Sequence, residues 1–113
     1  MSLYAEYIRE RESLEIIEHE DGFVTYKIVG KECFLADMYV RPHQRGNSLF
    51  KRLIYELCKI ARANKCDHIS TNIHTLDVNC SRAIKAALKV DFSIINANNG
   101  TILLVKKLGV QNG

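Results

Sequence analysis

The first dozen residues carry apolar positions at helical spacing with charged residues between them. These positions are Leu3, Tyr4, Tyr7 and Ile8. From residue 14 the spacing changes, and three apolar segments follow at residues 14–20, 23–29 and 32–40, separated by Asp-Gly and Gly-Lys turns. The pattern predicts a short amphipathic helix and then an antiparallel meander of three strands.

The third apolar segment is nearly continuous from Cys33 to Val40 and is interrupted only by Asp37. Such a run is typical of a central strand, and we expect both of its faces to be covered. Pro42 cannot donate to a strand ladder and biases Arg41 away from helix, so the strand should end there. A turn through residues 43–46 should follow.

The longest helical pattern runs from about residue 47 to residue 64, with leucine and isoleucine on one face and lysine and arginine on the other. Residues 67–74 then alternate, with Ile69, Thr71 and Ile73 on one side and polar residues on the other. This second pattern predicts a strand with one polar face.

A second helix is predicted to begin at a capping residue, either Asp77 or Asn79, and to run to about residue 89. Its apolar stripe should be Ala83, Ile84, Ala87 and Leu88. Two final strands, at residues 92–95 and 101–108, are joined by a segment rich in asparagine and glycine. The predicted order is (α)βββ-α-β-α-ββ, an α/β fold with a mixed, mostly antiparallel sheet flanked by helices.

Length and composition limit the chain to one globular unit. It has 113 residues, of which 47% are hydrophobic and 26% charged, so we expect a single domain over residues 1–113. The net charge of +3 is too small to hold a nucleic acid by charge alone, and no apolar run is long enough for a membrane helix. We therefore expect a cytoplasmic protein without a membrane partner, and a nucleic-acid partner is disfavoured, although a local basic patch stays possible.

The cysteine and histidine residues are scattered along the sequence. Cys33, Cys58, Cys66 and Cys80 form no CxxC pair, and the four histidines do not group beside them. The pattern favours reduced thiols and no metal site.

The junction between the third strand and the long helix is the most informative part of the sequence. A buried strand stops at Pro42, turns through Arg45 and Gly46, and enters a helix. Such a turn can direct backbone N–H groups and the positive end of the helix dipole at one point, which suits a phosphate or pyrophosphate. The alternative is an ordinary turn in which Gly46 supplies flexibility and Arg45 is solvated.

Residues 32–108 resemble the GNAT superfamily of N-acetyltransferases. Val40, Pro42 and the Arg45-Gly46 pair match its acetyl-CoA loop and the strand before it, and residues 79–92 resemble its later helix motif. The resemblance implies a GNAT-like fold and transfer of an acetyl group from acetyl-CoA, as cosubstrate, to a primary amine acceptor without a metal. The residues that would bind acetyl-CoA are Met38, Tyr39, Val40, Arg45, Gly46, Asn47, Ser48 and Asn79.

The sequence also departs from the family pattern. His43 stands at the Gln or Arg position of the loop, and Ser48 and Phe50 stand where two further glycines are common. Glycine there lets the backbone approach the pyrophosphate, but Phe50 also fits the apolar stripe of its helix. Ala87 stands at the position of a tyrosine that protonates the leaving thiolate in many members, so general acid help from that position is missing.

The family mechanism implies direct attack of a neutral amine on the thioester, with a strand N–H near residues 38–40 binding the carbonyl oxygen. A base must accept the amine proton, and the candidates are Glu32, Asp37 and His74. Each also has a structural interpretation: Glu32 as a solvated turn residue, Asp37 as a hydrogen-bonded strand residue, and His74 as a surface group.

Two other functions stay open at this point. The first is a catalytically inactive GNAT-fold protein that recognises CoA or a macromolecular partner, which the loop departures and Ala87 would fit. The second, less favoured, is a nucleic-acid binder that uses the basic face of the long helix. Longer members of the family use additional N-terminal structure to build part of the acceptor pocket, so the resemblance implies a thin wall here. Either a large acceptor supplies its own complementarity or a second subunit completes the site, and we predict a homodimer.

Overall fold

The computed structural model describes residues 2–46 and 48–109. Six strands form one sheet in the order β1-β2-β3-β4-β6-β5. The strands are β1 (Glu15–His19), β2 (Gly22–Val29), β3 (Glu32–Val40), β4 (His68–His74), β5 (Ser93–Asn98) and β6 (Thr101–Lys107). All neighbouring strands are antiparallel except β3 and β4, which are parallel. The predicted order of elements and the mixed, mostly antiparallel sheet are confirmed.

Three α-helices and one short 3-10 helix connect or precede the strands. They are α1 (Leu3–Glu12), η1 (Pro42–Gln44), α2 (Leu49–Ala63) and α3 (Cys80–Lys89). Ser2 caps α1 through a 3.0 Å hydrogen bond from the Ala5 N–H to its hydroxyl oxygen. The predicted N-terminal helix is therefore confirmed.

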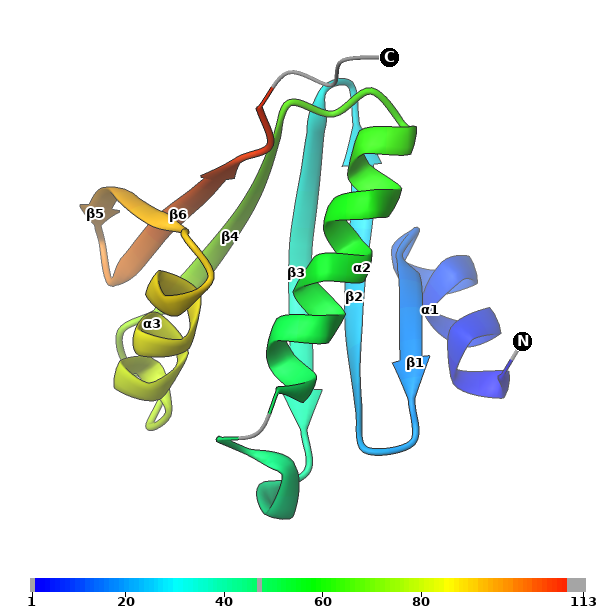
Figure 1. Cartoon of the computed structure of the whole chain (residues 1–113), viewed down its shortest axis with the longest axis horizontal. Helices are drawn as coiled ribbons and strands as arrows, with labels where there is room; N and C mark the ends of the chain where they lie inside the picture. Colours follow the sequence, from blue (N-terminus) through cyan, green and yellow to red (C-terminus); the bar gives the residue numbers. More distant parts are fainter. Residues whose placement is uncertain (1, 47, 110–113) are drawn as a thin grey trace.

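The main core lies between one face of the sheet and the helices α2 and α3, which cover that face (Figure 1). The apolar stripe of α2 contributes Leu49, Leu53, Ile54, Leu57, Cys58 and Ala61 to this core. On β2 and β3 the residues that face α2 include Val24, Cys33 and Leu35. Burying a leucine or isoleucine stabilises the fold by about 1.5 to 3 kcal/mol, so this face supplies much of the stability.

Helix α1 packs on the other face of the sheet. Its buried residues, Ala5 and Ile8, do not belong to the α2 core, and Tyr4 contacts Phe23 with ring centroids 5.8 Å apart. Phe23 neighbours Val24 on β2, and adjacent strand residues point to opposite faces. Below, the face that carries Phe23 is called the back face.

Two expectations about burial are wrong. β3 is central, but within it only Cys33 and Leu35 are buried, because α1 covers only part of the back face. In α3 only Ala87 is buried; Ala83 is exposed, and Leu88 is 46% exposed. Ala83 borders an open cleft, described next, whereas Leu88 does not line it.

Candidate active site

The parallel strands β3 and β4 separate halfway along their length. Their pairing runs from Glu32 opposite His68 to Leu35 opposite Thr71 and stops there. Beyond it, residues 36–40 of β3 and residues 72–74 of β4 diverge, which Figure 1 shows as the two strands spreading toward the bottom of the view. Side chains from both strands, from α3 and from the start of α2 surround a cavity of about 640 Å³ at this opening, called the cleft below.

A β-bulge in β3 lies where the strands begin to diverge. Tyr26 pairs with Leu35 and Thr25 pairs with Asp37, so Ala36 is an extra residue with no partner on β2. A bulge bends its strand and increases the local twist. It also reverses the alternation of side chains: Met38 packs on the α2 core, whereas Asp37 shares the back face with Tyr39.

The register shows which backbone groups of β3 face the cleft. The Arg41 N–H donates to the Asp21 carbonyl at 2.8 Å, so Arg41 and Asp21 form a hydrogen-bonded antiparallel pair. Hydrogen-bonded pairs occur at every second residue of an antiparallel ladder, so Tyr39 and Asp37 also direct their backbone groups to β2. The N–H and C=O groups of Met38 and Val40 therefore point away from β2, into the cleft.

Two charged side chains occupy part of this free strand edge. The Asp37 carboxylate accepts a 2.8 Å hydrogen bond from the Met38 N–H. The Arg45 Nε donates to the Val40 carbonyl at 3.0 Å, and the same guanidinium lies 5.7 Å from the centre of the Tyr39 ring. Backbone groups that a paired strand would satisfy are thus satisfied by exposed side chains.

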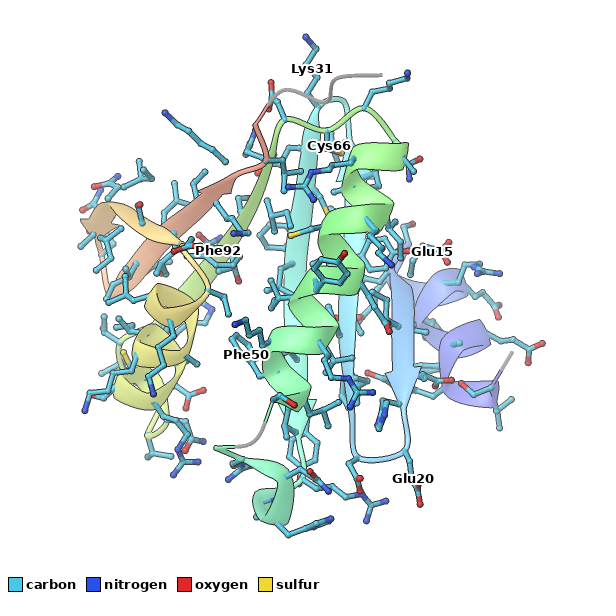
Figure 2. The ribbon with its side chains drawn as sticks, viewed as in Figure 1. Glu15, Glu20, Lys31, Phe50, Cys66 and Phe92 are labelled. Atoms are coloured by element: carbon cyan, nitrogen blue, oxygen red, sulfur yellow. The ribbon has the colours of Figure 1, made fainter. Side chains whose placement is uncertain are left out.

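The predicted anion loop lies at the same end of the cleft. After η1, Gly46 has φ +88°, and apart from its chain neighbours no described residue has an atom within 4 Å of where a Cβ would stand. Helix α2 begins at Leu49. Arg45 and Gly46 line the cleft, whereas Ser48 does not, and Asn47 lies outside the described residues. Phe50 also lines the cleft and packs on the core, and Figure 2 shows it projecting from α2 on the side of α3.

The remaining cofactor candidates also border the cleft. Met38, Tyr39 and Val40 line it from β3, and Asn79 lines it from the start of α3. Asn79 occupies the N-cap position of α3 but makes no side-chain capping bond among the described residues, and its N–H donates instead to Asp77 at 2.7 Å. The predicted start of the helix at Asn79 is confirmed, but the helix begins without the side-chain hydrogen bond that a capping asparagine can make.

The three proposed bases do not lie together. Asp37 on β3 and His74 on β4 line opposite sides of the cleft. By strand alternation His74 lies on the back face, as Asp37 does, because its neighbour Ile73 packs on the core. Glu32 lies in the paired part of the strands, where its carboxylate accepts a hydrogen bond from the Ser70 hydroxyl, and it does not line the cleft.

Ala87 borders the cleft from α3, at the place where the family resemblance puts a tyrosine. It is buried, with 5% of its surface exposed, so a methyl group replaces the phenol there. Polar side chains nearer the start of α3, including Arg82 and Cys80, also line the cleft.

Three buried thiols lie in the core between α2 and the sheet, and one of them, Cys33, belongs to the paired part of β3. Burial raises the pKa of Cys33 to about 12, with smaller contributions from the nearby Cys66 and Cys58 thiols. Cys33, Cys58, Cys66 and Cys80 are all free cysteines. Over residues 2–46 and 48–109, no cluster of three His, Cys, Asp or Glu side chains is placed to bind a metal ion, and no helix is long and apolar enough to cross a membrane.

The sequence pattern did not reveal two residues of the site. Ala36, as the extra bulge residue, places Asp37 on the back face, and Thr71 closes the paired part through a 3.0 Å hydrogen bond from its hydroxyl to the Leu35 carbonyl. The break that Asp37 makes in an apolar run was the available signal for the bulge, because a charge in phase with core residues indicates a change of register.

A sheet whose central parallel strands diverge beside the start of a helix defines the N-acetyltransferase fold. The sequence profile described as the Acetyltransferase (GNAT) family matches residues 4–92. The chain therefore belongs to the GNAT acetyltransferase family. No curated protein matches its sequence.

Solved structures of acetyltransferases share this fold. PaiA N-acetyltransferase from Thermoplasma acidophilum, in complex with coenzyme A, is 20% identical with a TM-score of 0.73 over 90% of this chain and 67% of that one. Aminoglycoside 6'-N-acetyltransferase complexed with coenzyme A is 14% identical, with a TM-score of 0.76 over 95% of this chain and 79% of that one. The ribosomal-protein-S18-alanine N-acetyltransferase from Escherichia coli is 12% identical, with a TM-score of 0.69 over 99% of this chain and 80% of that one. The chain spans only part of each neighbour's length.

Proposed function

We propose that this chain transfers an acetyl group from acetyl-CoA to a primary amine. The observation that carries the proposal is the free edge of β3, where the backbone groups of Met38 and Val40 face a cleft that ends at the turn before α2. An extended ligand arm with amide groups can add to such an edge as a strand does. Coenzyme A is bound in the related PaiA structure, which supports the same class of donor here.

The phosphate groups of the donor would lie at the start of α2. Gly46 leaves open space for a close approach, and the Arg45 guanidinium can leave the Val40 carbonyl to pair with a phosphate oxygen. The positive end of the α2 dipole favours the same charge. The Met38 carbonyl and the backbone groups of Val40 would hold the arm, the Tyr39 side chain would line it, and the Met38 N–H stays available for the thioester oxygen. Asn79 would contact the donor from the start of α3.

Acetyl transfer then requires one bond exchange and one proton transfer. The amine lone pair attacks the thioester carbon, the C–N bond forms, the C–S bond breaks, and the CoA thiolate leaves. A cleft-facing N–H of β3 stabilises the carbonyl oxygen as its negative charge develops. The amine must lose a proton, and Asp37 or His74, on opposite sides of the cleft, accepts it directly or through water.

The back face is the side from which the amine would approach. Asp37 and His74 lie on this face, whereas the donor enters beside α2 on the other. Since α1 covers only part of the back face, a large acceptor or a second copy of the chain would complete the wall. The homodimer stays a prediction that light scattering tests.

A second candidate function is donor binding without catalysis, and Ala87 favours it. Without a phenol at that position, the leaving thiolate must take its proton from water or from another side chain. A general acid contributes roughly 10²- to 10⁴-fold to rate, so its loss slows transfer.

Thermal unfolding with acetyl-CoA and with CoA tests the donor site, because a ligand that binds only the folded state raises the unfolding temperature. Release of CoA thiol over a panel of amines then separates an enzyme from a binding protein. Whichever of Asp37 and His74 is the base, its replacement by alanine should abolish the release of CoA thiol. Glu32→Gln should retain that release. An unfolding temperature that does not change at millimolar acetyl-CoA would overturn the proposal.

A further inference from the structure

The Asp37 carboxylate occupies a backbone donor that the proposed reaction needs. The Met38 N–H points into the cleft, and in this structure it donates to the carboxylate oxygen Oδ1 at 2.8 Å. A backbone amide has a single proton to donate. A thioester oxygen seated at Met38 and the Asp37 carboxylate therefore compete for the same donor.

From this competition we infer that Asp37 is a removable occupant of the acyl-oxygen site, and that donor binding releases it toward the amine. The inference rests on the proposed function. In the free protein the carboxylate covers the Met38 N–H; when acetyl-CoA enters, the thioester oxygen takes that N–H. The carboxylate then turns to the back face, where the amine approaches, so the base becomes available only after the donor is in place.

The surroundings of Asp37 make this exchange inexpensive. Its side chain is exposed, and among the described residues it forms no ion pair, so one hydrogen bond to Met38 is the contact it must give up. The bulge at Ala36 leaves Asp37 on the back face while the Met38 N–H faces the cleft. A carboxylate freed from Met38 therefore needs only a side-chain rotation, with no change in the backbone, to face the acceptor.

The exchange predicts an order of binding and a specific pattern of affinities. Acetyl-CoA has the thioester oxygen that competes with Asp37, whereas CoA lacks it. Removal of the carboxylate should therefore tighten the binding of acetyl-CoA more than that of CoA. A hydrogen bond contributes about 0.5 to 1.5 kcal/mol, which corresponds to an effect of roughly 2- to 13-fold.

The test is calorimetric titration of wild type, Asp37→Ala and Asp37→Asn with acetyl-CoA and with CoA. We expect Asp37→Ala to raise the ratio of acetyl-CoA to CoA affinity about 2- to 13-fold. Asp37→Asn keeps an oxygen that can accept from Met38 but removes the charge, so its ratio should lie nearer to wild type. Asp77→Ala removes another carboxylate from the cleft and is the matched charge control: it should change both affinities by the same factor.

The outcomes separate this inference from the proposed function. If wild type binds neither ligand, the proposed function fails. If wild type binds both and Asp37→Ala leaves their ratio unchanged, the donor site stands and the occupancy by Asp37 is wrong. The Met38 amide proton resonance gives an independent reading: it should move upfield in Asp37→Ala without ligand, and an unmoved resonance overturns the inference even if the affinities change.

Discussion

The Thr71 hydroxyl donates a 3.0 Å hydrogen bond to the Leu35 carbonyl across the last paired position of β3 and β4. This bond is buried, and the strands separate beyond it. It therefore marks where the cleft begins, because β3 and β4 stop pairing with each other from the next residue onward while each keeps its other neighbour in the sheet.

Replacing this hydroxyl should weaken the closed end of the cleft. Thr71→Val keeps the side-chain shape and leaves the buried Leu35 carbonyl with one partner fewer, so we expect a loss of about 1 kcal/mol in the free energy of unfolding by urea. Thr75→Val is the matched control, since its hydroxyl donates to the Gly100 carbonyl at 3.1 Å at an exposed site. The control should lose less free energy of unfolding, and equal losses in the two variants would contradict the role given to Thr71.

Deletion of the bulge residue should remove the bend in β3 without moving its side chains to the other face. Without Ala36, Leu35 would directly precede Asp37, and both residues would keep their partners on β2, Tyr26 and Thr25, in a regular ladder. A straighter β3 should close part of the cleft, so we expect the thermal stabilisation by CoA to fall in the deletion variant. Circular dichroism should show that this variant is folded, and Ala36→Ser, which keeps the extra residue, should keep the stabilisation. Undiminished stabilisation in the deletion variant would show that the bulge does not open the cleft.

A negative charge at the turn before α2 should remove donor binding. Gly46→Asp places a carboxylate beside the proposed phosphate site, and we expect the thermal stabilisation by CoA to disappear. Gly30→Asp is the control, because Gly30 also has a positive φ, +60°, with no atom within 4 Å, but lies in the turn between β2 and β3. Both variants carry similar backbone strain. Retained stabilisation in Gly46→Asp would mean that the phosphates bind elsewhere.

The four thiols should differ in reactivity. Cys80 is half-buried and lines the cleft, whereas Cys33, Cys58 and Cys66 are buried. Burial raises the pKa of each of these three thiols, to about 12 for Cys33, and a thiol reacts through its thiolate. Iodoacetamide at pH 7.5 should modify Cys80 first, and saturating CoA should slow that reaction. Mass spectrometry that finds Cys33 modified before Cys80 would refute this prediction.

Alkaline pH should destabilise the fold in part through Cys33. The folded protein keeps the Cys33 proton up to about pH 12, whereas the unfolded chain releases it near the ordinary thiol pKa of 9.0. The raised pKa therefore contributes stability that is fully present below pH 9 and is lost as the pH rises toward 12. We expect the stability gap between wild type and Cys33→Ala, measured by urea unfolding, to narrow from pH 8 to pH 11. A constant gap would exclude this contribution.

Much of the fold could be predicted from local pattern. The apolar stripe of α2, the alternation in β4 and Pro42 at the end of β3 each depend on neighbours in sequence, and each prediction is confirmed. The exposure of Ala83 and Leu88 was missed, because periodicity shows which side of a helix is apolar but not whether another element covers it. Among the candidate site residues, the sequence placed Asp37 and His74 in strands but could not show that they border one cavity.

The sequence by itself determined the order of elements, the turn at Arg45 and Gly46, and the family resemblance, because these depend on residue spacing along the chain. Only the tertiary structure decided where β3 and β4 separate, which face Asp37 occupies, and that Glu32 lies outside the cleft. The reason is that the pairing of β3 with β4, two strands more than 30 residues apart in sequence, decides where the strands separate, and one unpaired residue in the β2–β3 pairing decides the register of β3. A shift of one residue in that register moves every later side chain to the other face of the sheet.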